Sequence, residues 1–444
     1  MTEKAERPVL CWLPPLYFAQ GLPAVIIAEV SIILFNEFGM IDSAVAFWSN
    51  FLGLIPLLLI KLFCAPVVDS LSRRRNWIFA GQLALAVLFL LSALACKVSH
   101  PLPWLILIFF LASLTSGVHD IAADGFYILA LDDHRQAVYS GFRSVFNRIA
   151  AVVGSGGFII FAGWLAGSGK VSTATAWSLT LTLAAGTVFL LALWSGFFMP
   201  HPEQDRPGQF SMKGWFGKEF SGVFVSFFRK KYVWTVLLFL LLYRLGEAQL
   251  SVMSRLFLLE EDGLALSKVQ YGSMVGVYGV AMMLIGGVLA GFLCGKFGLG
   301  RMLLPMALAI NVPDLLYVLL AFWQGTVPQL LTGTCVAVEQ FGYGFGFAGY
   351  MLFMVWFAST SKDEHKTSHF ALMTVFMIAG LRLPGMPSGW IAENIAQWIP
   401  CGWTNYQLFF LWVMVCTLPG FWVTYLAGKI VDPDYGMKSG KIRS

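Results

Sequence analysis

Charged residues are scarce in this sequence. Asp, Glu, Lys and Arg make up 12% of the 444 residues, whereas soluble domains carry about 25%. Hydrophobic residues make up 58%, and the mean hydropathy is +0.74. The composition therefore excludes a water-soluble globular protein. It predicts an integral membrane protein whose main partner is the lipid bilayer.

Several signatures of chemistry are also missing. No Gly-rich phosphate-binding loop of the Walker A type occurs, so ATP is not expected to drive the protein directly. No His-Glu-x-x-His pattern occurs, and the seven Cys residues lack the spacing of metal ligands. We therefore expect no cofactor, no metal site and no enzymatic activity, and we interpret the cysteines as packing residues.

Long apolar runs fill most of the chain. A membrane-spanning helix needs about 20 apolar residues, and the sequence offers twelve such stretches. They lie at residues 9–36, 43–67, 77–96, 102–130, 137–166, 175–199, 232–259, 270–294, 300–323, 327–358, 368–396 and 404–428. The predicted fold class is an all-α integral membrane protein with twelve transmembrane helices.

The composition changes at residues 200–231, which are polar, basic and marked by Pro and Gly. This segment divides the predicted helices into two groups of six. We predict an N-terminal half at 1–199, a cytoplasmic linker at 200–231, a C-terminal half at 232–430 and a cytoplasmic tail at 431–444. Two repeated halves often face each other across a binding site at the membrane midplane.

The net charge of +5 follows the membrane topology and does not indicate a nucleic-acid partner. With a cytoplasmic N-terminus, the outer loops hold only Lys97, Lys170 and Lys268, and the remaining loop cations lie inside. This bias predicts that both termini are cytoplasmic. No cleavable signal pattern precedes the first apolar run, so we expect that run to remain as a helix. We expect the protein to function as a monomer.

Acidic residues interrupt an apolar run in the stretch HDIAADGFY, which starts at His119. Asp120 and Asp124 are four residues apart and share one face of a helix. Two carboxylates this close need a proton or a facing cation, and Arg143 and Arg148 follow in the next predicted helix. We interpret the pair as a buried proton or ion-pair site, and the alternative is a structural link between two helices. His119 is interpreted as a hydrogen-bonded packing residue.

A second polar stripe lies in YRLGEAQLSVMSRLF, within the seventh apolar run. Arg244, Glu247, Ser251 and Arg255 fall on one helical face, and Arg244 can pair with Glu247. Guanidinium groups suit an anionic ligand such as a carboxylate. We predict that this stripe lines a cavity, and the alternative is a set of ion pairs to neighbouring helices.

Two further runs carry candidate site residues. In EQFGYGFGFAGY, Glu339, Tyr343 and Tyr350 share a face, and aromatic rings beside a carboxylate suit a sugar or an aromatic ring. Packing is the alternative for these rings. In YFAQGLP, the Gly and the Pro predict a broken helix near Gln20, which would expose backbone polar groups to a solute. Glu29 is a further buried acid.

The loop after the second run reads APVVDSLSRRRNW. Asp69 followed by Arg73, Arg74 and Arg75 resembles the cytoplasmic loop signature of the major facilitator superfamily. The resemblance implies a gate that latches the cytoplasmic side. The alternative is that the arginines only set the topology.

Four segments point to one family within this superfamily. They read LYFAQGLP, KLFCAPVVDSLSRRRNW, HDIAADGFYILALDDH and EQFGYGFGFAGY. Together they resemble the AmpG-like family of muropeptide permeases, acetyl-CoA transporters and siderophore importers. This chain lacks the two extra C-terminal helices of the best-known permeases. It also has Gly125, Phe126 and Tyr127 where those permeases tend to have Ala, Tyr and Arg.

The resemblance implies a major facilitator fold of two six-helix halves and secondary active transport. We expect proton-coupled uptake of a small-molecule solute of the muropeptide type, an amino sugar linked to a short peptide, across the bacterial inner membrane. A siderophore importer is the alternative within the family, and a transporter-like sensor or scaffold and a drug exporter are alternatives of other classes. The candidate proton-coupling residues are Asp120, Asp124, Glu29, Glu247 and Glu339. The candidate substrate-binding residues are Gln20, Arg143, Arg148, Arg244, Arg255, Tyr343 and Tyr350.

Overall fold

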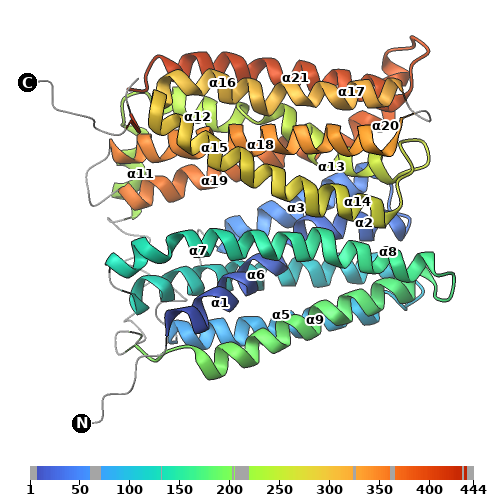
Figure 1. The fold of residues 1–444 in the computed structure, drawn as a ribbon, viewed down its shortest axis with the longest axis horizontal. Coiled ribbons are helices and arrows are strands. Elements are labelled where there is room, and N and C mark those ends of the chain that lie inside the picture. Colours follow the sequence, from blue (N-terminus) through green and yellow to red (C-terminus); the bar gives the residue numbers. More distant parts are fainter. Residues whose placement is uncertain are drawn as a thin grey trace, which may run out of the picture. The chain divides into compact units, whose positions relative to one another are not determined.

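The computed structural model describes residues 8–60, 72–131, 133–202, 205, 220–323, 327–360, 366–432 and 435–437. Within these ranges every regular element is helical and no strand occurs (Figure 1). Eleven of the described helices are long and apolar enough to cross a membrane. The predicted second span, 43–67, begins as α3 (Asp42–Leu59) and runs on into residues outside the described ranges. The predicted all-α membrane fold is confirmed.

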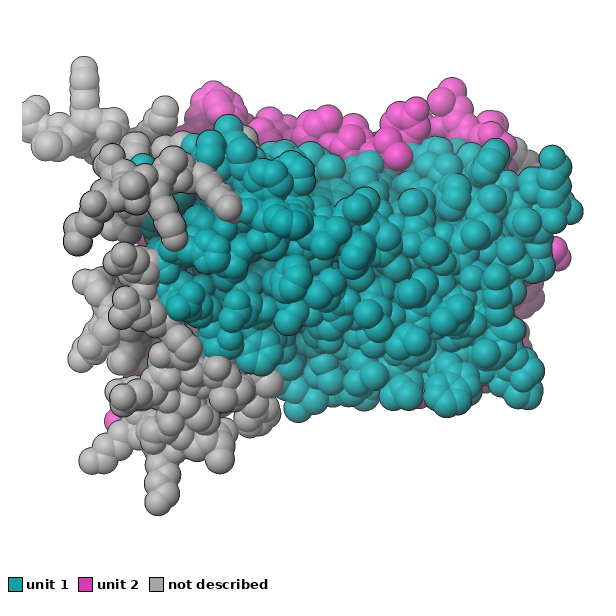
Figure 2. Space-filling model, turned by 90° about the horizontal axis from the view of Figure 1, so that it is seen from below, with its two compact units in different colours: residues 1–40, 51–212, 267–276 teal, residues 41–50, 213–266, 277–444 magenta. Residues whose placement is uncertain are grey.

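Two compact units divide the chain, and Figure 2 colours them separately. Unit 1 comprises residues 1–40, 51–212 and 267–276. Unit 2 comprises residues 41–50, 213–266 and 277–444. The first nine residues of α3 therefore belong to unit 2 and its remainder to unit 1, whereas a short segment that follows residue 266 belongs to unit 1.

The regular elements of unit 1 in the described residues are all helical. In chain order they are α1 (Val9–Val25), the π-helical turn η1 (Ile26–Val30), α2 (Ser31–Glu37), the second part of α3, α5 (Arg74–Ala95), α6 (Pro101–Ala130), α7 (Asp133–Ala151), the π-helical segment η3 (Val152–Phe158), α8 (Ile159–Gly167), α9 (Thr173–Phe198) and α14 (Lys268–Tyr271). Helix α5 packs against α6 and α9, and α1 packs against α6, α7 and α9.

Unit 2 has the same kind of construction. Its elements are the start of α3, α11 (Phe220–Phe228), α12 (Val233–Leu242), α13 (Leu245–Leu259), α15 (Val280–Phe297), α16 (Leu299–Asn311), the 3₁₀ turn η6 (Val312–Asp314), α17 (Leu315–Phe322), α18 (Gln329–Ser359), α19 (Lys366–Gly385), α20 (Ser388–Trp398) and α21 (Asn405–Gly428). The π-helical segment η5 (Gly272–Gly279) lies at the boundary between the two units.

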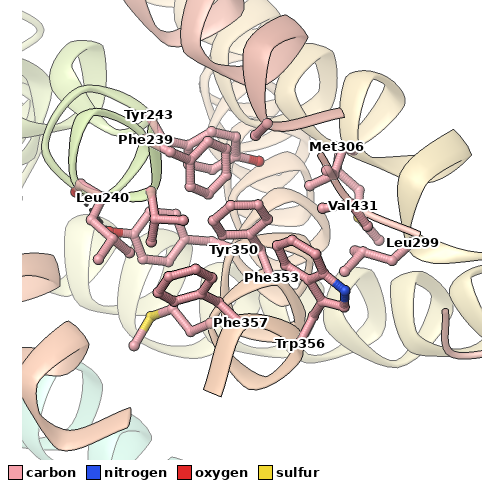
Figure 3. Packing of buried hydrophobic residues seen from close by; sticks show 14 of the residues in the cluster. Phe239, Leu240, Tyr243, Leu299, Met306, Tyr350, Phe353, Trp356, Phe357 and Val431 are labelled. Carbon is pink, nitrogen blue, oxygen red and sulfur yellow. Dashed lines mark hydrogen bonds between the residues drawn. The ribbon is translucent and has the colours of Figure 1, made fainter. Parts of the chain in front are cut away.

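Aromatic side chains fill the core of unit 2 (Figure 3). Phe239 on α12 stacks on Tyr350 of α18 with ring centroids 5.5 Å apart, and it lies 4.3 Å from the ring of Phe353. The hydroxyl of Tyr350 donates to the carbonyl of Leu240 at 2.7 Å. In membrane proteins, such contacts hold helices together through close packing rather than through exclusion of water.

Glycines bring α15 and α18 into backbone contact. A Cβ at Gly286 would overlap the carbonyl oxygen of Phe341, and a Cβ at Gly344 would overlap the carbonyl oxygen of Met283. Small residues of this kind allow helix axes to approach closely in lipid. These two glycines therefore set the spacing between α15 and α18.

The helix break predicted near Gln20 is wrong. Helix α1 continues through Gly21 and Pro23 to Val25, and the irregular turn comes later, at η1. A Cβ at Gly21 would lie 2.6 Å from Asn147 Oδ1, so this glycine serves the contact with α7 rather than a break. Pro23 lacks the backbone donor of a regular helix, and the wider π-helical turn begins three residues after it.

Candidate functional site

An ion pair between α6 and α7 forms the centre of the candidate site in unit 1. Arg143 Nη2 lies 2.6 Å from Asp124 Oδ1. The rings of Tyr17 and Tyr127 flank the guanidinium, with centroids 4.7 and 4.6 Å from its Cζ atom. The Tyr17 hydroxyl also donates to Asp124 Oδ1 at 3.3 Å. The side chains of Arg143 and Asp124 are 33% and 43% exposed, so water or a solute can reach the pair.

Asp120 lies one turn before Asp124 on α6. Its Oδ1 accepts a hydrogen bond from Nε2 of Gln20 on α1. The oxygen of that amide, Gln20 Oε1, is buried and has no hydrogen-bond partner in the described part of the chain. Gln20 therefore keeps an acceptor available for a donor group. His119 is fully buried, and its Nε2 lies 3.2 Å from Gln82 Nε2, which agrees with its interpretation as a packing residue.

Two candidate residues of unit 1 lie away from the ion pair. Arg148 is half-buried on α7, five residues after Arg143 and therefore about 140° around the helix from it. Glu29 lies in the π-helical turn η1 and is also half-buried. Sequence spacing alone had grouped Arg148 with Arg143, whereas the helix turns the two side chains toward different neighbours.

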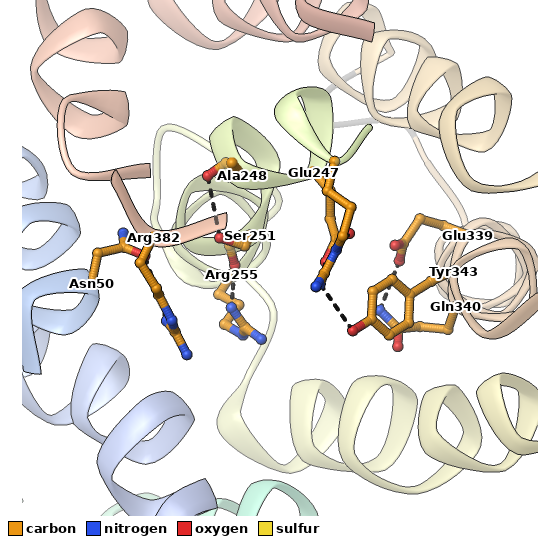
Figure 4. Close-up of polar contacts among 10 residues, drawn as sticks. Asn50, Glu247, Ala248, Ser251, Arg255, Glu339, Gln340, Tyr343 and Arg382 are labelled. Carbon is orange, nitrogen blue, oxygen red and sulfur yellow. Dashed lines mark hydrogen bonds and ion pairs between the residues drawn. The ribbon is translucent and has the colours of Figure 1, made fainter. Parts of the chain in front are cut away.

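A second charged group lies in unit 2, where the helix is interrupted between α12 and α13 (Figure 4). Arg244 is the residue that precedes α13, and its guanidinium meets both carboxylate oxygens of Glu247, at 2.6 and 2.7 Å. It also donates to the hydroxyl of Tyr343 at 3.2 Å and lies 4.9 Å from the ring centroid of Phe347. Arg244 is only 5% exposed and the side chain of Glu247 is 14% exposed, so this expected pair is largely shielded from water.

Three other candidate residues of unit 2 occupy different surroundings. Glu339 is 7% exposed, and one of its oxygens accepts a hydrogen bond from the amide of Gln340 at 2.9 Å. Arg255 donates to the carbonyl of Ser251, one turn earlier on α13. Tyr350 is fully buried in the aromatic core, and its hydroxyl is bonded to backbone. The structure therefore groups Arg244, Glu247 and Tyr343 together but places Tyr350 in the packing of the helices.

The residues predicted to form a cytoplasmic gate are only partly described. Asp69 lies outside the described ranges. Arg73 precedes α5, and the backbone N–H groups of Arg74 and Arg75 donate to the two carboxylate oxygens of Asp205, at 2.8 and 3.2 Å. Asp205 thus caps the N-terminus of α5, which is a favourable position for a carboxylate. The Arg74 and Arg75 side chains reach backbone carbonyls of α6 and α9.

A cluster of acidic side chains surrounds the start of α3, and Asp42 in this cluster lies outside the candidate membrane spans. The backbone N–H of Ser43 donates to Glu393 Oε1 at 2.8 Å. Burial and, after it, the neighbouring carboxylate of Glu260, which is hydrogen-bonded to Asp42, together raise the pKa of Asp42 to about 8. Tyr406 donates to Glu260 Oε2 at 2.6 Å. The first turn of α3 is therefore held in unit 2 by groups that share protons.

Sequence reasoning missed three of these contacts. It did not select Tyr17 and Tyr127 as flanks of Arg143, although both lie in the quoted stretches LYFAQGLP and HDIAADGFY. It also missed Asp205, the helix cap in the linker, because nothing in the local sequence marks a capping contact between distant segments. One sequence signal could have identified the two tyrosines as site residues. Each lies in an apolar run that also contains an acidic residue.

Comparison with known proteins agrees with this architecture. The family model described as "Major Facilitator Superfamily" matches residues 16–384. A relative from Rickettsia conorii, called "Putative transporter AmpG 4", is 22% identical over 427 residues, which cover 92% of this chain and 94% of the relative. The "Anhydromuropeptide permease" of Escherichia coli K12 is 22% identical over 357 residues, covering 79% of this chain and 66% of the permease.

A solved structure shows the same fold. It is a bacterial homologue of the human lysosomal transporter Spinster in an inward-facing, unoccupied conformation. It matches with a TM-score of 0.70 and 15% identity over 96% of this chain and 98% of the other. The family match spans most of the sequence, and the helices, their packing and their buried charges agree with it. This multi-pass membrane protein therefore belongs to the Major Facilitator Superfamily of transporters.

Proposed function

We propose that the protein takes up a muropeptide-type solute across the bacterial inner membrane and couples this uptake to protons. The observation that carries the proposal is the ion pair of Arg143 with Asp124, flanked by two tyrosine rings and followed one turn away by Asp120. Acidic residues within membrane spans commonly mark proton or substrate paths. The solute class is taken from the name of one relative, the "Anhydromuropeptide permease" of Escherichia coli K12.

The two charged groups have different parts in this proposal. Asp124 exchanges its partner between Arg143 and a proton, since a carboxylate near an arginine favours the charged form and loses that preference when the arginine moves away. Glu29, Glu247 and Glu339 are further candidates for proton transfer. Arg244 and Tyr343 suit a carboxylate and a sugar ring of the solute, and Gln20, Arg148 and Arg255 are further candidates for contact.

Alternating access requires movement of two halves, which we propose to be residues 1–199 and 232–430, with both termini in the cytoplasm. In this proposal the loop of Asp69, Arg73, Arg74 and Arg75 closes the cytoplasmic side, and the protein acts as a monomer. A siderophore importer is a second candidate. The stacked rings of Tyr343 and Phe347, with centroids 5.8 Å apart beside Arg244, would also suit the aromatic and anionic groups of a siderophore.

Uptake into proteoliposomes tests the proposal. The purified protein is reconstituted, an inside-alkaline pH gradient is imposed, and labelled anhydromuropeptide and a labelled ferric siderophore are offered in parallel. We expect gradient-dependent accumulation of the muropeptide and its loss when a protonophore is added. Accumulation of the siderophore alone would show that the solute is a siderophore and not a muropeptide. Binding of a solute without accumulation would favour a sensor or scaffold and overturn the transport proposal, and exchange of protons in the opposite direction would indicate an exporter.

A further inference from the structure

A buried acid in unit 2 has no role in the site described above. Asp314 is the last residue of η6, the 3₁₀ turn that interrupts the membrane span at 299–322. It is 3% exposed, and its Oδ2 atom is buried with no hydrogen-bond partner among the described residues. Leaving a buried carboxylate oxygen unbonded costs free energy. An unbonded oxygen at this depth therefore requires a ligand or a proton.

The surroundings of this oxygen are set by close helix packing. Pro313 lies against Gly342 of α18, where a Cβ would come within 3.0 Å of the proline ring. On the other side, a Cβ at Gly246 of α13 would lie 3.5 Å from both Asn311 Oδ1 and Asp314 Oδ2. The two oxygens therefore border the same small space, which the missing side chain of Gly246 leaves open.

The charges around Asp314 are of its own sign. The ionisable groups that act on it electrostatically are Glu339 of α18 and Glu247 of α13. Both oxygens of Glu247 are bonded to Arg244, so this carboxylate is ionised and already has a cation of its own. The cation that acts on Glu339 is Arg255. Helix α21 contributes the methyl group of Thr417 at this point, 2.7 Å from the Cβ position of Gly246.

The charges of these neighbouring groups indicate whether Asp314 is ionised or protonated. An ionised carboxylate without a cation would cost several kcal/mol at such a buried place, and two acidic neighbours increase that cost. A proton on Oδ2 removes the charge and converts the unbonded oxygen into a donor, and Asn311 Oδ1 is an acceptor at the edge of the same space. A hard cation such as Mg²⁺ or Ca²⁺ takes about six or more oxygen ligands, whereas a proton needs one acceptor.

We propose that Asp314 is a proton-binding site in unit 2, separate from the pair of Asp120 and Asp124 in unit 1, and that it holds a proton in the conformation described. The use of this proton in coupling rests on the proposed transport function. The presence of the proton does not, since it can be measured without any solute. In transport, Asp314 would release its proton when the helices around η6 move and water reaches Oδ2.

Infrared spectroscopy of the full-length protein in lipid vesicles measures this proton directly. The carbonyl-stretch band of protonated carboxyl groups is recorded at about pH 7 for the wild type, for Asp314→Asn and for Glu261→Gln, which removes an exposed acid after α13. We expect the band to lose the contribution of one carboxyl group in Asp314→Asn and to be unchanged in Glu261→Gln. An identical band in the wild type and Asp314→Asn would overturn the proposal.

Two further measurements test the proposal if Asp314→Asn does not fold or if a metal cation is bound. In the first, the carboxyl band is titrated in Glu339→Gln. Loss of this interacting neighbour should shift the midpoint of the titration by about one pH unit or more, and an unshifted midpoint would overturn the proposal. Sodium chloride is also compared with choline chloride. Loss of the band only in sodium would mean that a metal cation occupies the site instead of a proton. Failure of muropeptide uptake leaves all these readouts intact, so the two proposals fail separately.

Discussion

Arg143 meets Asp124 through a single oxygen, Oδ1, while the rings of Tyr17 and Tyr127 lie against its guanidinium. Cation–π contacts of this kind contribute about 0.5–2 kcal/mol each. They would hold the arginine in place when the carboxylate is neutralised. The arginine would therefore remain positioned if Asp124 took up a proton, as the proposed function requires.

Asp124→Asn tests the role of this carboxylate. The amide keeps the size of the side chain but cannot exchange a proton, so proton-driven accumulation of labelled anhydromuropeptide in proteoliposomes should be lost. Exchange of labelled for unlabelled solute without a gradient should continue. Glu261→Gln is the matched control and should behave as the wild type. Normal accumulation by Asp124→Asn would remove this residue from coupling.

Removal of one partner from the buried pair of Arg244 and Glu247 should destabilise the fold. Arg244→Ala leaves Glu247 buried without its cation, and such a loss costs about 3–5 kcal/mol. Exchange of the two side chains for Met and Gln should cost less than the single change, because no unpaired charge remains. Thermal unfolding in detergent, followed by circular dichroism, measures the loss of stability in each variant. Equal losses for the single and double variants would contradict the expected coupling.

Gly286→Ala should weaken the contact of α15 with α18. The new Cβ would overlap the carbonyl oxygen of Phe341, which is backbone and cannot rotate away. Overpacking of this kind typically costs about 1–3 kcal/mol. Gly291→Ala on the same helix is the control, because a Cβ there has no atom within 4 Å among the described residues. Similar melting temperatures for the two variants would show that the spacing of these helices can adjust.

Asp42 predicts a pH dependence of stability. Its pKa in the folded chain is about 8, above the ordinary value of 3.8. The folded state therefore holds a proton that the unfolded state releases between these values, so the stabilisation is complete below about pH 4 and is lost as the pH rises through about 8. The melting temperature should fall between about pH 4 and about pH 8 and change little above that range. Asp42→Asn cannot ionise and should show a flatter profile; the same slope in both proteins would contradict the assignment.

Asp205→Ala should destabilise the start of α5. The carboxylate accepts from the backbone N–H groups of Arg74 and Arg75, and loss of an N-terminal cap costs about 0.5–2 kcal/mol. Asp205→Asn keeps one acceptor oxygen and should retain part of the stability. Hydrogen exchange of the first turn of α5 measures the effect locally. Unchanged protection in the alanine variant would mean that the cap is dispensable.

Much of the fold follows from the sequence for a simple reason. Lipid offers no hydrogen-bond partner to backbone N–H and C=O groups, so long apolar runs must form helices that satisfy these groups internally. The length of each run then predicts which residues span the membrane. The pair of Arg244 and Glu247 was predictable in the same way, since residues three apart on a helix are neighbours. The pair of Arg143 and Asp124 was predictable as well, because only a short turn separates their helices.

The remaining features depend on contacts between distant segments. Tyr17 comes to lie against Arg143 only because α1 packs beside α6 and α7, and no local pattern encodes that distance. The helix around Gln20 stays intact because Gly21 is used for contact with Asn147, a role that the sequence does not distinguish from a break. The space beside Asp314 Oδ2 is left open by Gly246, a residue on another helix, and the sequence around Asp314 does not encode that contact.

The contact between α15 and α18 has a mechanical consequence. At Gly286 and Gly344 the nearest atoms of the facing helix are backbone atoms. A sliding motion at these two places requires no side-chain rotamer to change. The contact can therefore act as a shear plane within unit 2, along which one helix shifts past the other.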